Sequence, residues 1–95
     1  MKLTQQVKFA DSVFAQEVDG EMVLLDMNSE NYFGLDEVGS SIWQAIEAED
    51  GMLERVLEVL LDVYDVEEEV LKRDLLTFVD KLAKSGLVEV LNEAG

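Results

Sequence analysis

The chain has 95 residues, of which 48% are hydrophobic and 31% charged, a balance typical of one globular domain. It contains no cysteine and no histidine, which excludes disulfides, thiolate nucleophiles, Cys/His zinc sites and a histidine general base. Seven basic residues against 22 acidic ones give a net charge of −15, so nucleic-acid phosphates would be repelled.

The N-terminal segment, residues 1–8, lacks the apolar stretch and the small-residue cleavage site of a signal peptide. The longest unbroken apolar run, Met22 to Leu25, is too short to cross a membrane. We therefore expect a cytoplasmic protein with no membrane partner. Its acidity has two interpretations, which are attraction of a basic partner and simple solubility.

The first elements predicted along the chain are strands. Two apolar-rich runs, residues 13–18 and 21–27, flank Asp19-Gly20, a dipeptide typical of the type I′ turn of a β-hairpin. A second turn, residues 28–30, leads into a short strand at 31–35. Together these runs predict a three-stranded antiparallel meander.

From Asp36 onward the apolar period becomes helical. Asp36 is the predicted N-cap of a first helix that ends near Glu47, before the break at residues 49–51. A second helix is predicted from an apolar stripe whose members recur at helical spacing. These members are Leu53, Val56, Leu57, Leu60, Leu61 and Tyr64.

A third helix is predicted to follow, with Asp65 as its N-cap and Glu68 completing a capping box. Gly86 is placed to end this helix in a left-handed conformation, with Leu87 folding back onto it. A short last strand is predicted at 87–90. The order of elements predicts an α+β domain resembling a winged helix-turn-helix, which spans residues 1–95 with its core at about 12–90.

Four pieces of the sequence, in this order, resemble the PqqD-like family. They are an apolar strand with a polar turn, Tyr-Phe-x-Leu followed by Val-Gly-x-x-Ile-Trp, an L-x-x-x-Tyr-Asp-Val junction, and a Phe-hydrophobic-x-x-Leu-x-x-x-Gly-Leu ending. They occupy residues 23–30, 32–43, 59–66 and 78–88. The family comprises leader-peptide recognition elements for ribosomally made, modified peptides. The Tyr-Phe-Gly-Leu variant is most similar to the free-standing members that serve lasso-peptide biosynthesis.

The resemblance implies binding without catalysis and without a cofactor. The leader of a precursor peptide is expected to add as a strand to the edge of the third strand, in the groove between that strand and the third helix. Expected pathway partners are a leader peptidase and an ATP-dependent macrocyclase. The net charge further suggests a leader with Lys or Arg near the bound segment.

The residues expected to bind the leader come from two elements. Those of the strand, mainly through their backbone, are Asn31, Tyr32, Phe33, Gly34 and Leu35. Those at the margin of the third helix's apolar arc are Val70, Leu71, Arg73, Asp74, Thr77, Phe78 and Lys81. Core packing explains Leu71 and Phe78 equally well, and a solvated face explains the charged residues. Val38, Ile42 and Trp43 are expected in the core.

Three other readings of the sequence are weaker. A phosphopantetheine carrier protein is the main alternative, since Ser40 and Ser41 follow a loop, but its Asp-Ser-Leu triplet is missing. The spacing of Asp26 and Glu37 matches the ends of a calcium loop, yet Asn31 replaces the glycine that the loop needs, so no metal is expected. The third helix is too acidic at its start for a winged-helix DNA-binding protein.

Overall fold

The computed structural model describes residues 2–91. Its larger sheet has three antiparallel strands. Its strands lie in the order β2 (Val13–Val18), β3 (Glu21–Asp26) and β4 (Asn31–Gly34), so β2 and β4 are the two edges. Asp19 and Gly20 link β2 to β3 with φ values of 52° and 85°, the left-handed values that a type I′ turn requires. The predicted meander is confirmed.

Asp26 closes the turn between β3 and β4. Its Oδ1 accepts hydrogen bonds from the backbone N–H of Asn28 at 3.0 Å and the hydroxyl of Ser12 at 3.2 Å. Its Oδ2 accepts the hydroxyl of Ser29 at 3.1 Å. These bonds, above all the one from Asn28, hold the pKa of the Asp26 carboxyl below its usual range. The carboxylate therefore serves the turn that leads into β4.

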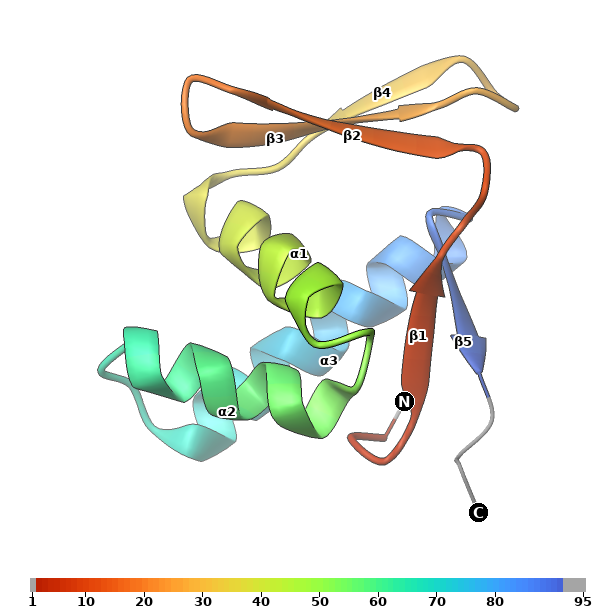
Figure 1. The fold of residues 1–95 in the computed structure, drawn as a ribbon. Coiled ribbons are helices and arrows are strands. Elements are labelled where there is room, and N and C mark those ends of the chain that lie inside the picture. Colours follow the sequence, from red (N-terminus) through yellow and green to blue (C-terminus); the bar gives the residue numbers. More distant parts are fainter. Residues whose placement is uncertain (1, 92–95) are drawn as a thin grey trace.

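Three helices lie on one side of the sheet: α1 (Glu37–Ala48), α2 (Leu53–Val63) and α3 (Glu68–Lys84). Figure 1 shows α1 next to the sheet and α2 on the far side of α1. Asp36 caps α1 as predicted, because its Oδ1 accepts the backbone N–H of Gly39 at 2.7 Å. No helix within residues 2–91 is long and apolar enough to span a bilayer.

The predicted cap of α3 is wrong. Its N-cap is Glu67, which makes no capping bond with its side chain, so the helix begins after Asp65 and the capping box does not form. The reason is the connection from α2, which has extended backbone at Tyr64 and again at Glu67 while it reverses the chain. The C-terminal end of α3 agrees with the prediction. Gly86 has the left-handed φ of 77°, and Leu87 after it is buried.

A second, two-stranded sheet joins the ends of the chain. β1 (Gln6–Phe9) pairs antiparallel with β5 (Val88–Leu91), which confirms the predicted last strand with a shift of one residue. β1 is not predicted by the sequence pattern, because it has only four residues and its partner lies at the other end of the chain. In Figure 1 this pair stands beside the helices.

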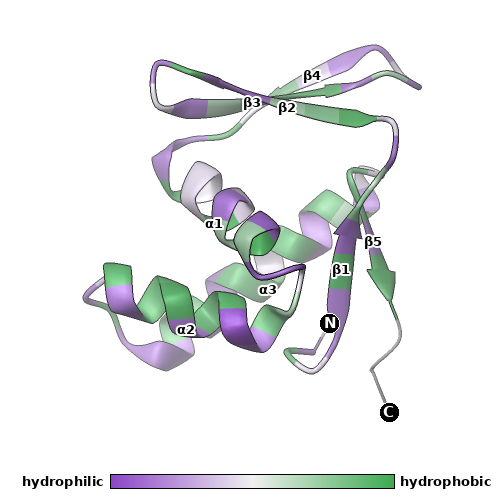
Figure 2. Cartoon of the chain, in the orientation of Figure 1, coloured by the Kyte–Doolittle hydropathy of each residue, from purple (hydrophilic) through white to green (hydrophobic). Residues whose placement is uncertain are grey.

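The core lies among the three helices and extends to β3 of the three-stranded sheet and to the β1–β5 pair. Leu24 of β3 and Trp43 of α1 are almost fully buried, as are Leu75 and Val79 of α3. Phe9 of β1 covers Trp43, with ring centroids 4.1 Å apart and planes 8° from parallel. Figure 2 shows hydrophobic residues along α3, which lies among the other helices. This core holds β4 and α3 in fixed relation.

Candidate functional site

The outer edge of β4 has unpaired backbone groups. The N–H of Leu35 donates to the carbonyl of Met22 at 2.9 Å, which fixes the hydrogen-bonding alternation along the β3–β4 ladder. Because bonded and non-bonded pairs alternate in an antiparallel ladder, Phe33 bonds β3, whereas the N–H and C=O groups of Tyr32 and Gly34 face away from it. β4 therefore offers the backbone of two residues to a further strand.

The side chains of β4 alternate between the two faces of the sheet. Phe33 is half-buried and packs against the core. Tyr32 points to the opposite face and is 72% exposed. There it stands in register with Leu25, which in turn pairs with Phe14 of β2. Tyr32 thus adds its backbone to the free edge, while its ring belongs to the outer face of the sheet.

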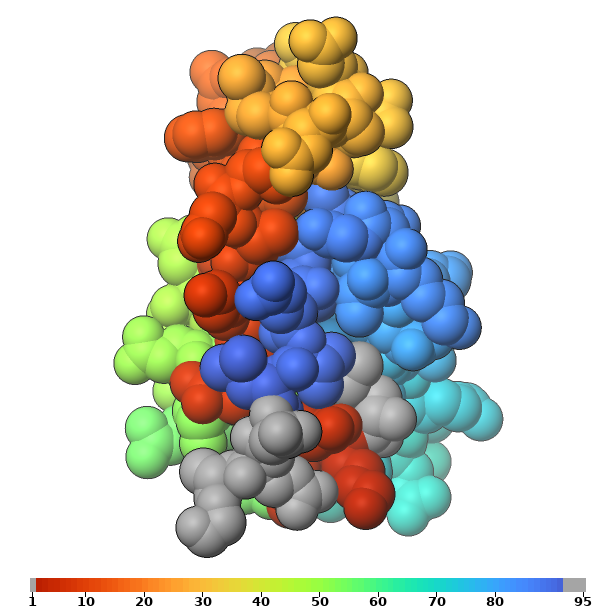
Figure 3. Space-filling model, turned by 90° about the vertical axis from the view of Figure 1, so that its right-hand side faces the viewer, coloured from red at the N-terminus to blue at the C-terminus, as the bar shows by residue number. Residues whose placement is uncertain are grey.

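A groove of about 410 Å³ separates the junction of β4 and α1 from α3. Its strand-side and α1 residues are Gly34, Leu35, Asp36, Val38, Gly39 and Ile42. Its α3 residues are Asp74, Thr77, Phe78 and Lys81. Figure 3 shows the yellow-orange segment that includes β4 at the top of the molecule, above the blue residues of α3. The free edge of β4 and the α3 wall therefore belong to one site.

Six of the twelve expected site residues meet in this groove: Gly34, Leu35, Asp74, Thr77, Phe78 and Lys81. Val70 and Arg73 line a neighbouring hollow of about 580 Å³ on α3, which shares only Thr77 with the groove. Leu71 lies in the core and is 5% exposed. Asn31 is exposed at the start of β4, opposite Asp26.

The groove also contains residues that the sequence placed elsewhere. Val38 was expected in the core, and this prediction is wrong, because Val38 is 48% exposed and lines the groove. The four-residue spacing does put Val38 and Ile42 on one face of α1. That face is buried at Ile42 but exposed at Val38, in the first turn of the helix. Asp36, Gly39 and the buried Ile42 are the remaining additions. The sequence pattern indicated only a capping role for Asp36 and a core position for Ile42.

The two charged residues on the α3 wall of the groove form no ion pair within residues 2–91. Asp74 and Lys81 lie on its α3 wall, and neither belongs to the ion pairs found within residues 2–91, which are Lys8–Glu89 and Lys84–Asp80. No lysine or arginine occurs between Lys8 and Arg55, so every charged side chain of the three-stranded sheet and of α1 is acidic. The groove can therefore accept a cationic side chain near Asp74 and an anionic one near Lys81.

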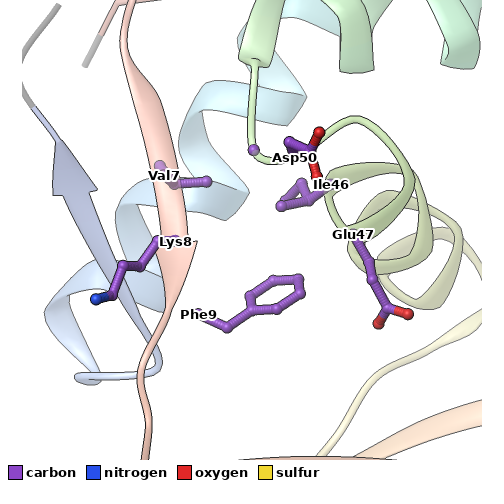
Figure 4. A pocket seen from close by; sticks show the side chains of 7 residues that line it. Val7, Lys8, Phe9, Ile46, Glu47 and Asp50 are labelled. Carbon is purple, nitrogen blue, oxygen red and sulfur yellow. The ribbon is translucent and has the colours of Figure 1, made fainter.

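Another pocket, of about 240 Å³, lies between β1 and the C-terminal end of α1. Figure 4 shows the Phe9 ring directed toward α1 and the Lys8 side chain directed away from it. The backbone N–H of Val7 in this pocket already donates to Gly51 at 3.0 Å, and Lys8 pairs with Glu89 at 3.9 Å. The β1 edge at this pocket is thus already paired at Val7, whereas the β4 edge faces outward at both Tyr32 and Gly34.

Residues 21–88 match the family model described as coenzyme PQQ synthesis protein D (PqqD). The chain belongs to the PqqD family. This match contains the whole groove, from Gly34 to Lys81. Among curated proteins the chain has no significant match.

Two solved structures are similar to this PqqD-family chain over most of its length. One is TbiB1 in complex with the TbiA(beta) leader peptide, which is 38% identical with a TM-score of 0.81, covering 86% of this chain and 94% of that one. The other is lasso peptide synthetase B1 complexed with the leader peptide, which is 25% identical with a TM-score of 0.74, covering 88% and 98%. The resemblance to the PqqD-like proteins of lasso biosynthesis is thereby confirmed.

The phosphopantetheine carrier alternative is not supported. Ser40 is 3% exposed. Its Oγ accepts the backbone N–H of Met22 at 2.8 Å and donates to the carbonyl of Leu35 at 3.2 Å. A serine that carries a prosthetic arm has to be accessible, whereas this PqqD-family serine joins α1 to the sheet.

Proposed function

We propose that this PqqD-family chain captures the leader of a ribosomally made precursor peptide as an added strand on β4 and catalyses no step itself. The observation that carries the proposal is the outward-facing backbone of Tyr32 and Gly34 beside a groove walled by α3. Strand addition uses main-chain hydrogen bonds for affinity and side-chain pockets for the choice of partner. Both similar solved structures are leader-peptide complexes, which supports the same ligand class here.

The groove supplies two kinds of side-chain contact to such a strand. Val38 and Phe78 offer apolar surface on opposite walls, above the buried Ile42. Asp74 and Lys81 offer opposite charges on the α3 wall. The bound strand would therefore insert apolar side chains toward the floor and place charged ones along α3. We propose that the leader lies along residues 31–35 and bonds the backbone of Tyr32 and Gly34. Val70 and Arg73 would meet leader residues beyond Thr77.

The net charge of −15 favours a leader with lysine or arginine near the bound segment, because opposite charges steer encounter. We propose that the captured leader is presented to a leader peptidase and an ATP-dependent macrocyclase that make a lasso peptide. The cytoplasm, where ribosomes make precursor peptides, is the compartment that we propose for this capture.

Titration of the purified chain with a fluorescently labelled leader peptide tests the proposal. The TbiA(beta) leader is one probe, and the leader of any precursor gene beside the gene for this chain is another. Fluorescence anisotropy is expected to give a dissociation constant in the micromolar range or below, and a scrambled peptide of the same composition is expected not to bind. Mass spectrometry should find the leader unaltered after incubation. Failure of both leaders to bind, or cleavage of either one, would overturn the proposal.

A further inference from the structure

Gly39 lies in the first turn of α1 and faces Phe78 of α3 at the groove. A Cβ atom at this position would lie 3.2 Å from Cε2 and 3.4 Å from Cζ of Phe78, and 3.2 Å from Oδ1 of Asp36. All three residues line the groove. The ring of Phe78 therefore rests against bare backbone in the first turn of α1.

The backbone conformation does not explain the glycine. Gly39 has no positive φ, unlike Gly20, Gly51 and Gly86, and it lies inside α1. Glycine is among the poorest helix formers, so alanine would favour the helix here. What glycine provides at this position is room for the Phe78 ring.

Of the two neighbours, the ring is the one that can move. Oδ1 of Asp36 is held by its 2.7 Å bond from the N–H of Gly39, the bond that caps α1. The ring of Phe78 is the end of a side chain with two torsions and is only half-buried. A methyl group at residue 39 would therefore shift the ring by a few tenths of an ångström, and both the methyl and the shifted ring would take space from the groove.

We propose that Gly39 is a specificity-determining residue, which sets the depth of the groove by seating Phe78 against α1. This inference rests on the proposed function, since it concerns the same leader. The groove consequently accepts a bulky apolar leader side chain over Phe78, and a residue larger than glycine at 39 restricts it to a small one. The role is distinct from helix capping, because the N–H of residue 39 that donates to Asp36 is kept in every variant.

The test compares G39A, F78L and the double variant G39A/F78L with wild type, using the TbiA(beta) leader and the leader encoded beside this chain. G39A is expected to fold with an unchanged circular dichroism spectrum and to bind about tenfold more weakly. The double variant is expected to bind no worse than F78L alone, since the smaller side chain frees the space. Such non-additivity is the mark of direct coupling between two residues. Ser41→Ala, on α1 but outside the groove, is the matched control and should bind like wild type.

The outcomes separate this inference from the proposed function. If wild type binds neither leader, the proposed function fails and the inference fails with it. If wild type binds and G39A binds equally well, the inference alone is overturned. Additive losses in the double variant would also overturn it, because the two residues would then act independently.

Discussion

The Oγ of Ser40 in α1 accepts the backbone N–H of Met22 in β3 at 2.8 Å. The same hydroxyl donates to the carbonyl of Leu35 at 3.2 Å, and the N–H of Leu35 donates to the carbonyl of Met22 at 2.9 Å. Three hydrogen bonds thus join the end of β4, the start of β3 and α1. This junction holds the free edge of β4 beside the groove. Ser40, which stabilises the fold, therefore also positions the edge that we propose binds the leader.

Replacing Ser40 with alanine is expected to lower the free energy of unfolding by about 1–3 kcal/mol, because the N–H of Met22 would be left buried without a partner. Urea unfolding followed by circular dichroism measures this loss. Ser41→Ala makes the same chemical change one residue along α1 and is expected to stay within about 0.5 kcal/mol of wild type. Equal urea midpoints for the Ser40 variant and wild type would contradict the role of this junction.

Proline substitutions in β4 distinguish its outward from its inward backbone groups. Tyr32→Pro removes an N–H that faces away from β3, so the protein is expected to fold and to bind leader at least about tenfold more weakly. Phe33→Pro removes an N–H that bonds β3 and is expected to cost more than about 1 kcal/mol of stability. Thermal unfolding and anisotropy titration measure the two effects.

Phe33→Ala is the control for the second variant, since it removes the ring and keeps the N–H. A folded Tyr32→Pro variant with wild-type affinity for the leader would show that the leader does not pair with β4.

Reversing the charge of Asp74 tests the electrostatic part of the groove. Asp74→Lys is expected to weaken binding of a leader with basic residues by about three- to tenfold at low salt, and the loss should shrink as salt rises. Asp62→Lys makes the same change on α2, outside the groove, and should have the smaller effect. Equal losses in the two variants would mean that net charge, rather than a contact at Asp74, governs binding.

The lowered pKa of Asp26 predicts how its contribution to stability depends on pH. Its folded-state pKa lies below that of the unfolded chain, so the ionised form stabilises the fold above the unfolded value, and this contribution is lost as the pH falls through the folded value. Asp26→Asn is therefore expected to be less stable than wild type at neutral pH, by a margin that narrows toward about pH 3. Urea unfolding at several pH values measures the margin. A margin that stays constant over this range would contradict the assignment.

The elements that the sequence predicts well are those with local signals. Asp19-Gly20 defines the β2–β3 turn by its own conformational preference, and Asp36 caps α1 within its first turn. β1 escapes prediction because a strand of four residues is defined by its partner β5 rather than by its own pattern. The cap of α3 is mispredicted because Asp65 has the right residue type, yet the connection from α2 delays the helix to Glu68.

The candidate site is predictable in part for the same reason. Family resemblance points to β4 and α3, and the groove does contain Phe78 and Lys81. Helical periodicity shows which face of a helix a residue lies on, but not how far along the helix that face is buried. Val38 was therefore predicted in the core although it is exposed. The contact between Gly39 and Phe78 joins two elements, and no pattern within either one indicates it.

Hydrogen exchange of individual backbone amides, measured by NMR with and without a bound leader, tests strand addition on β4 most directly. In the free protein the amide of Phe33 should be protected, whereas those of Tyr32 and Gly34 should exchange quickly. With saturating TbiA(beta) leader, or the leader encoded beside this chain, the amides of Tyr32 and Gly34 are predicted to become protected. A leader that binds while both amides keep exchanging at their free rates would contradict the account.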